Sequence, residues 1–338
     1  MKLNADDKLA RELAMDESQR LRWFEALVFL QGLDGIGKAN IHKNFLDVVK
    51  NARDIRKVTD AAAFYKSISD DEIDAALKKA ASAVSMVKDM PDISVITIFD
   101  NAFPQRLRIM GSSCPLLLYV KGNKEALKKT GVAVIGTRYP TPWSEELEKR
   151  LVKKILDISD VSIVSGLALG CDRVAHETAL DNTRETVAVM PSGVNEITPA
   201  VHEKLAEDII LHGGCLLSEY APKETATKYT FIERDGVVAA MASAVLVIQC
   251  GIESGTMHTV EFAEKYHTAL GCYEGESSKG DYSGNRYILD HKNAFTVRDE
   301  HQVDEFLSIM KSTIDHASSD SSPHQDIPHQ MTLVDYFQ

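Results

Sequence analysis

The chain has 338 residues, 44% of them hydrophobic, and a formal net charge of −12. This length is enough for two domains with a sizeable core, and no apolar run reaches the ~20 residues that a membrane helix needs. The acidic balance argues mildly against a broad basic surface for nucleic acid, but it leaves room for a local groove built from a few Arg and Lys side chains.

The cysteines and the N-terminus indicate a protein of the reduced cytoplasm. The five cysteines are widely spaced and form no CxxC pair, so the pattern predicts neither a zinc site nor a disulfide framework. The first residues are polar and acidic, unlike a signal peptide. We expect a cytoplasmic protein without a bound metal or cofactor.

Residues 1–90 are predicted to form a small helical domain. Apolar residues recur at helical spacing over residues 19–30 and 73–87. Between these stretches, residues 33–38 (LDGIGK) have the apolar-x-Gly-apolar-Gly form of the turn in helix-hairpin-helix (SAM-like) domains, where glycine N–H groups meet a DNA phosphate. An ordinary packing turn between two helices is the alternative, and the pattern favours it at roughly two to one.

Residues 91–130 are interpreted as a connector that holds two short strands, at 95–99 and 116–122. From residue 131 onward, apolar runs alternate with stretches of helical periodicity. The apolar runs lie at 132–135, 161–164, 187–190, 215–217, 244–248 and 269–272, and the helical stretches at 144–156, 173–180, 200–211, 233–241 and 256–266. Continuous apolar strands separated by helices predict an α/β fold, a Rossmann-like doubly wound parallel sheet, over residues 131–310.

The C-terminal tail has two predicted parts. Residues 311–329 contain a polar stretch rich in Ser, Asp, Pro and His. They are predicted to be a disordered linker, because they have few apolar side chains that could form a core. Residues 330–338 contain a pattern typical of sliding-clamp-binding peptides, in which an aliphatic and two aromatic side chains fill an apolar pocket. The pattern consists of Gln330, Leu333, Tyr336 and Phe337. We expect it to bind a sliding clamp, with docking onto the chain's own domain as the alternative.

The most informative run is residues 165–172 (SGLALGCD), which lies between a predicted strand and a predicted helix. Gly166 and Gly170 let backbone N–H groups approach a ligand, and the N-terminus of a helix favours a phosphate. Asp172 stands where an N-cap residue belongs. Ser165, Gly166, Gly170 and Asp172 are therefore candidates for a phosphate- or nucleic-acid-binding loop at the edge of the sheet.

Two further loops follow predicted strands: Gly136-Thr137-Arg138 and Ser254-Gly255-Thr256. Ligands of open α/β sheets bind at the carboxyl ends of the strands. Several such loops at one edge of the sheet are therefore stronger evidence for a binding site than any one loop alone. Arg138 can make forked contacts to a phosphate. The alternative is that Arg138 pairs with an acidic neighbour, Asp172 or Glu219, and only covers the end of the sheet.

In order and spacing, these motifs resemble the DNA-processing protein A family (DprA, also called Smf). The resemblance covers about residues 100–307. It rests on Gly136–Arg138, on 165–172 with His176, on Ser218-Glu219-Tyr220, on Phe231-x-x-Arg234-Asp235, on 253–256 with Thr259, and on 284–288 (GNRYI).

The resemblance implies a single-stranded-DNA-binding protein without catalytic activity. Members of this family bind the strand in a basic pocket of the Rossmann-like domain, help to load the RecA recombinase, typically during natural transformation, and commonly act as dimers. Carried onto this chain, Arg138 and Arg234 are expected to pair with phosphates. The loop from Gly166 to Gly170 is expected to donate backbone N–H groups.

The chain also departs from the family pattern. The family's FPxRNR run reads FIERDG over residues 231–236, so that Gly236 replaces an arginine and the acidic Glu233 has entered. Cys171 stands where the family usually has isoleucine. Because the changes in the run lower the positive charge, the pattern predicts either weaker strand binding or a different ligand.

An enzymatic function is the alternative. Ser254-Gly255-Thr256 followed by Glu261 faintly resembles the GGxGTxxE run of lysine-decarboxylase-like phosphoribohydrolases, in which Glu261 would be the general acid or base. His176 lies one helical turn after Asp172 and could face a ligand, but a structural role in holding the loop is the preferred interpretation.

Overall fold

The structure, a computed structural model, describes residues 17–44 and 68–319. The chain divides into two compact units, and the boundary falls after Tyr119. None of the helices in the described ranges combines the length and apolar character needed to cross a bilayer.

The first unit is helical, as predicted, and also contains the start of the β-structure. Its elements are α2 (Glu17–Gly32), α4 (Asp70–Lys88), β1 (Ile93–Thr97), the 3-10 helix η2 (Gln105–Ser113) and the first part of β2 (Leu117–Gly122). Helix α4 begins with a capping box in which Ser69 and Glu72 satisfy each other's free backbone N–H groups. Most apolar residues of α2 are buried, among them Phe24 and Phe29.

The segment after α2 turns through Gly35, whose φ is +74°. Residues 38–44 are then helical. This is compatible with both readings of the LDGIGK turn, so the helix-hairpin-helix assignment stays a prediction.

The predicted connector at 91–130 contains β1 and β2, close to the two predicted strands, together with η2 and the 3-10 helix η3 (Lys124–Lys128). These elements divide between the two units, and the connector as a separate segment stays a prediction.

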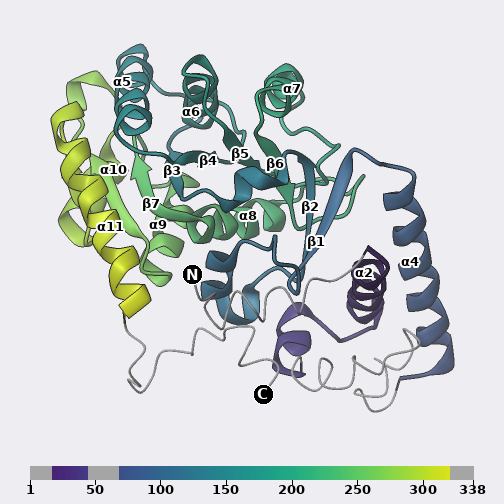
Figure 1. Cartoon of the computed structure of the whole chain (residues 1–338). Coiled ribbons are helices and arrows are strands. Elements are labelled where there is room, and N and C mark those ends of the chain that lie inside the picture. The colour runs from purple at the N-terminus through teal and green to yellow at the C-terminus, as the bar shows by residue number, and fades with distance from the viewer. Residues whose placement is uncertain (1–16, 45–67, 320–338) are drawn as a thin grey trace, which may run out of the picture. The chain divides into compact units, whose positions relative to one another are not determined.

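The second unit contains the predicted parallel sheet. Its strands are β3 (Gly131–Ile135), β4 (Ser162–Ser165), β5 (Thr186–Val189), β6 (Cys215–Ser218), β7 (Ala242–Val247), β8 (Ala269–Tyr273) and β9 (Phe295–Val297). They lie in the order β6-β5-β4-β3-β7-β8-β9, and every pair is parallel. Figure 1 labels the strands from β6 to β7. The predicted doubly wound α/β architecture is confirmed.

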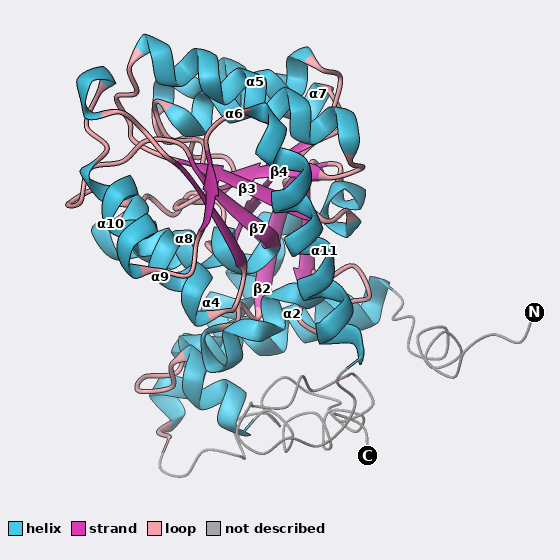
Figure 2. Ribbon diagram, turned by 90° about the vertical axis from the view of Figure 1, so that its left-hand side faces the viewer, coloured by secondary structure: helices cyan, strands magenta, loops and turns pink. Residues whose placement is uncertain are grey.

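Helices cover both faces of this sheet, as Figures 1 and 2 show for α5, α6 and α7 on one face and α8 and α9 on the other. The helices are α5 (Pro142–Ile158), α6 (Cys171–Asp181), α7 (Glu203–Leu211), α8 (Lys228–Met241), α9 (Thr256–Lys265), α10 (Ser283–His291) and α11 (Val303–Ser319). One core packs β3, through Val132 and Val134, against Leu151 of α5 and Phe306 of α11.

The C-terminal part of the domain differs from the sequence prediction. Strand β9 and helices α10 and α11 were not predicted, because β9 is only three residues long and α10 follows a polar segment. Helix α11 continues to Ser319, so the predicted linker does not begin at residue 311. The remainder of that linker and the clamp-type motif at 330–338 lie outside the described residues.

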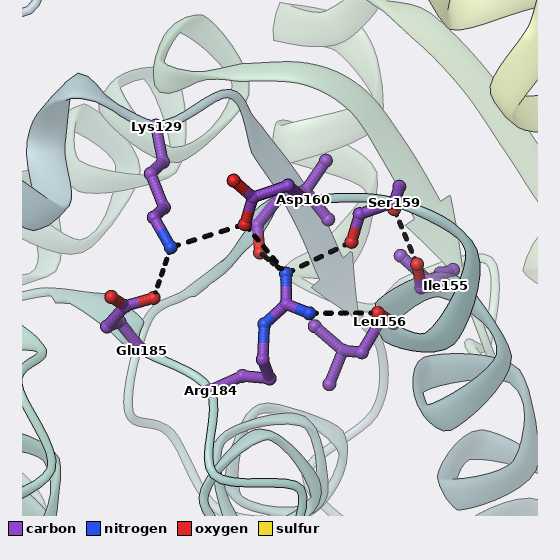
Figure 3. Close-up of polar contacts among 8 residues, drawn as sticks. Lys129, Ile155, Leu156, Ser159, Asp160, Arg184 and Glu185 are labelled. Carbon is purple, nitrogen blue, oxygen red and sulfur yellow. Dashed lines mark hydrogen bonds and ion pairs between the residues drawn. The ribbon is translucent and has the colours of Figure 1, made fainter.

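A polar cluster ties together the edge at which the strands begin (Figure 3). Lys129 Nζ lies 2.7 Å from Glu185 Oε2 and 3.3 Å from Asp160 Oδ1. The guanidinium of Arg184 donates to Asp160 and to backbone carbonyls at the end of α5, including that of Leu156, at 3.0 Å. These bonds satisfy carbonyls that a helix terminus leaves without partners, at the edge opposite the carboxyl ends of the strands.

We predict that Arg184→Ala lowers the free energy of unfolding by about 1–3 kcal/mol, because it leaves several carbonyls at the end of α5 without a donor. Urea unfolding followed by circular dichroism measures this. The matched control is Lys153→Ala, which removes an exposed i,i+4 ion pair with Asp157 and should cost about 0.5 kcal/mol or less. Equal losses in the two variants would contradict a capping role for Arg184.

Candidate functional site

The strand order reverses beside β3. From β3 the chain moves outward through β4, β5 and β6, and it then returns to pair β7 with the other side of β3. At such a reversal the connections leave in opposite directions, and a crevice opens beyond the carboxyl ends of the strands. The ladder between β3 and β7 continues past the strand ends, because Thr137 N donates to Gln249 O at 2.7 Å. The loops after these two strands therefore start from a common rigid edge.

A cavity of about 590 Å³ lies at this point. Its walls come from the loop after β3, the start of α6, the first three turns of α8 and the start of α9. The lining residues are Ile135, Gly136, Thr137, Arg138, Tyr139, Ala168, Asp172, Lys228, Phe231, Ile232, Arg234, Asp235, Val238, Ser254, Gly255, Thr256, His258 and Thr259. Of the predicted site residues, Gly136, Arg138, Asp172, Arg234 and the Ser254–Thr256 run are thus brought together.

The other predicted site residues do not line the cavity, but they support the loops around it. Ser165 is buried and donates to Val134 O at 2.7 Å. Gly170, at φ +77°, could not carry a side chain, because a Cβ there would lie 2.3 Å from Thr137 O. At Gly136 a Cβ would lie 2.5 Å from Cys171 Sγ. These glycines let the loops after β3 and β4 pack closely together.

Asp172 organises the glycine loop in a way that the sequence analysis did not predict. The N-cap of α6 is Gly170, not Asp172. From the first turn of the helix, the Asp172 carboxylate reaches back and accepts hydrogen bonds from Gly166 N (3.0 Å) and Ala168 N (3.2 Å). The expectation that the loop offers these N–H groups to a ligand is therefore wrong, because an internal carboxylate already occupies them.

Arg234 is the central charged group of the site. Its side chain is only 8% exposed, with Nη1 3.5 Å from Asp172 Oδ2 and Nε 3.4 Å from Asp235 Oδ1. It fits only because residue 166 is glycine: a Cβ on Gly166 would lie 1.1 Å from Arg234 Nη1. Within the described part of the chain the guanidinium makes no hydrogen bond, and Nε is a buried donor without a partner. A buried guanidinium with open donors favours an anionic ligand.

Phe231 lies beside both arginines. The guanidinium carbons of Arg138 and Arg234 lie 5.5 and 6.0 Å from the centroid of its ring. Arg138 is exposed and forms no ion pair with Asp172, Glu219 or any other described residue, so its charge is available at the mouth of the cavity. Lys228, one turn before Phe231 on α8, adds another exposed charge. The sequence pattern did not predict a role for Lys228, and Phe231 entered only through the family resemblance, although their i,i+3 spacing puts both on one helix face.

Two carboxylates partly neutralise the positive charge of the cavity. Asp172 and Asp235 flank Arg234, and burial raises the pKa of Asp235 to about 6, although Arg234, His258 and Arg138 favour its ionised form. Exposed His258 also lines the cavity. The site is thus a mixed one, in which phosphate-binding cations and hydrogen-bond acceptors lie side by side.

His176 is buried and does not line the cavity, but its hydrogen bond is not the expected one to the glycine loop. Its Nδ1 lies 2.7 Å from Thr186 Oγ1 on β5. Because burial lowers its pKa to about 3, the imidazole is neutral at pH 7. No cluster of three or more His, Cys, Asp or Glu suited to a metal occurs among residues 17–44 and 68–319.

The structure shows what the two residues that depart from the family run, Gly236 and Glu233, contact. Gly236, which replaces an arginine, is buried, and a Cβ there would lie 3.4 Å from the ring of Phe262 on α9. The position is therefore used for packing between α8 and α9. Glu233 is exposed, accepts a hydrogen bond from the Tyr220 hydroxyl at 2.6 Å, and does not line the cavity.

We predict that Gly166→Ala displaces the Arg234 guanidinium and lowers the free energy of unfolding by about 1–3 kcal/mol through overpacking. Thermal unfolding and urea titration measure the loss. Gly255→Ala is the matched control, because nothing lies within 4 Å of a Cβ at Gly255. If Gly166→Ala were as stable as Gly255→Ala, the close fit between Gly166 and Arg234 would be disproved.

Comparisons with known proteins agree on one family. The family model for DNA recombination-mediator protein A matches residues 94–308. DNA processing protein DprA of Streptococcus pneumoniae is 34% identical over 203 residues, which make up 60% of this chain and 70% of that protein. The chain spans 58% of the length of other relatives, including the Smf protein of Escherichia coli.

Solved structures agree with this match. The crystal structure of S. pneumoniae DprA has the same fold, with a TM-score of 0.66 and 23% identity over 90% of this chain and 98% of that one. DNA processing protein A of Helicobacter pylori, which binds single-stranded DNA, superposes with a TM-score of 0.56 and 28% identity over 65% of this chain and 96% of that one. Since the family model covers well over half of the sequence, the chain belongs to the DNA recombination-mediator protein A (DprA/Smf) family.

Proposed function

We propose that this chain binds single-stranded DNA in the cavity at the carboxyl ends of β3 and β7. The observation that carries the proposal is the buried Arg234 guanidinium, which has open hydrogen-bond donors and faces a cavity whose mouth carries Arg138 and Lys228. Phosphate oxygens are the acceptors that guanidinium groups bind best in a forked geometry. A backbone phosphate would complete the bonds that the protein leaves unmade.

The aromatic wall favours a single strand over a duplex. Phe231 offers a ring between two guanidinium groups, and an unpaired base can stack on such a ring whereas a base inside a duplex cannot. The H. pylori relative binds single-stranded DNA, which supports the same ligand here.

From the family assignment we infer that the bound strand is passed to a RecA-type recombinase, in DNA uptake or another recombination process. Such a role needs no catalytic residue, and it belongs in the cytoplasm, where the strand and the recombinase meet. A homodimer is the expected assembly. A sliding clamp remains a second proposed partner, through Gln330, Leu333, Tyr336 and Phe337.

The phosphoribohydrolase alternative has less support. Its proposed acid or base, Glu261, is exposed and is not among the lining residues of the cavity. A general acid or base must come within hydrogen-bond reach of the reacting group. No other carboxylate occupies the glutamate position of the GGxGTxxE run.

Arg138→Ala and Phe231→Ala should weaken strand binding in different ways. Loss of the Arg138 phosphate contact should lower affinity about tenfold or more and reduce the slope of log K against log salt by about 0.7. Loss of the Phe231 ring should cost about 1–3 kcal/mol per stacked base with no change of slope. Fluorescence anisotropy of labelled single- and double-stranded oligonucleotides across a salt series measures both quantities.

Lys153→Ala is the control for this pair, because it removes the same unit charge from α5, outside the cavity lining. It should leave affinity and slope nearly unchanged. Wild-type affinity in Arg138→Ala, or no preference of the wild type for single strands, would refute the proposed site.

The recombinase role has its own test. On single strands covered by a single-stranded-DNA-binding protein, addition of this chain should shorten the lag before a RecA-type recombinase hydrolyses ATP. Arg138→Ala should shorten the lag less, because a weakly held strand cannot be passed on. An unchanged lag with the wild-type chain, under conditions where it binds the strand, would count against recombinase loading while leaving strand binding intact.

A further inference from the structure

The two carboxylates of the cavity are not equivalent. Asp172 is already engaged by the protein, because its Oδ2 accepts from two backbone N–H groups and lies 3.5 Å from Arg234 Nη1. Asp235 lines the same cavity with a side chain that is 15% exposed, and it accepts no hydrogen bond from any group in the described ranges. Among the described residues its one ion pair is with Arg234 Nε, at 3.4 Å, and this contact is not a hydrogen bond. A largely buried carboxylate with open acceptor sites calls for donors from a ligand.

The position of Asp235 on α8 indicates which part of a ligand it meets. Phe231 and Asp235 are four residues apart, so their side chains are neighbours on one face of the helix, and Lys228 precedes Phe231 by one turn. All three line the cavity. A base stacked on the Phe231 ring would thus have a phosphate-binding cation on one side and the Asp235 carboxylate on the other.

We propose that Asp235 reads the donor edge of a nucleobase and makes the cavity prefer guanine over thymine; this inference rests on the proposed function. The Watson–Crick edge of guanine carries two adjacent donors, N1–H and the N2 amino group, which match the two oxygens of a carboxylate. Thymine offers a single N3–H between two carbonyl oxygens, which repel a carboxylate. Carboxylates likewise accept from base amino groups in duplex readout.

Asp235 of the FIERDG run stands where the resemblance to the family's FPxRNR run implies asparagine. An amide offers one acceptor and one donor, so it does not discriminate in the same way. The charged neighbours keep the carboxylate usable: Arg234, Arg138 and His258 favour its ionised form, against burial and Asp172. With a pKa of about 6, Asp235 is ionised at pH 8 and protonated at pH 5.

The test is competition anisotropy with short thymidine oligomers, in which one internal base is thymine, guanine or hypoxanthine. Hypoxanthine keeps N1–H but lacks the N2 amino group. For the wild type at pH 8, we expect the guanine oligomer to bind about fivefold or more tightly than the thymine oligomer, with hypoxanthine between them. The preference should fall as the pH is lowered from 8 to 5, because a protonated carboxyl no longer accepts from both donors.

Asp235→Asn should reduce the preference to less than about twofold while binding the all-thymine oligomer at least as well as the wild type, which also reports that the variant is folded. Glu233→Gln removes the same charge from a side chain outside the cavity lining and should keep the preference. Equal wild-type affinity for all three oligomers, or an unchanged preference in Asp235→Asn, would overturn the inference and leave the proposed function standing. Failure of every oligomer to bind would overturn both.

Discussion

The reversal of strand order beside β3 is the constraint on which the site depends. Because β4 and β7 pair with opposite sides of β3, the loops that follow β3 and β7 leave a shared edge in diverging directions. The extra ladder bond from Thr137 to Gln249 fixes where they diverge. Helices α6, α8 and α9 then meet the crevice from three sides, and each contributes lining residues. The cavity is thus a consequence of topology, and side chains only decide its chemistry.

The chemistry is dominated by one buried cation. Removing a guanidinium from water is costly unless carboxylates compensate it, and Arg234 has two, Asp172 and Asp235. Space for the group exists because Gly166 has no side chain. The proposed anion site is therefore compatible with a net charge of −12, because its positive potential comes from a few placed groups and needs no basic surface.

The departures from the family run change the character of the site as well as its charge. An arginine has been replaced by Gly236, which packs against Phe262, and the mouth of the cavity retains Arg138 and Lys228. In the same run, Asp235 stands where the FPxRNR pattern implies an asparagine. Compared with that pattern, the run has one positive charge fewer and one more hydrogen-bond-accepting carboxylate close to the Phe231 ring.

The sequence by itself determined the alternation of strands and helices from residue 131 onward and the glycine loops at the strand ends, because periodicity and turn chemistry are local properties. It also placed Arg138 at the end of a strand. Only the tertiary structure decided that Asp172 occupies the N–H groups of the glycine loop, that Arg234 is buried against Gly166, and that Phe231 and Asp235 face the same cavity. The contact of Arg234 with Gly166 joins segments far apart in the chain. The other two relations lie within one loop or one helix, but they depend on side-chain orientation and helix packing, which the sequence pattern does not encode.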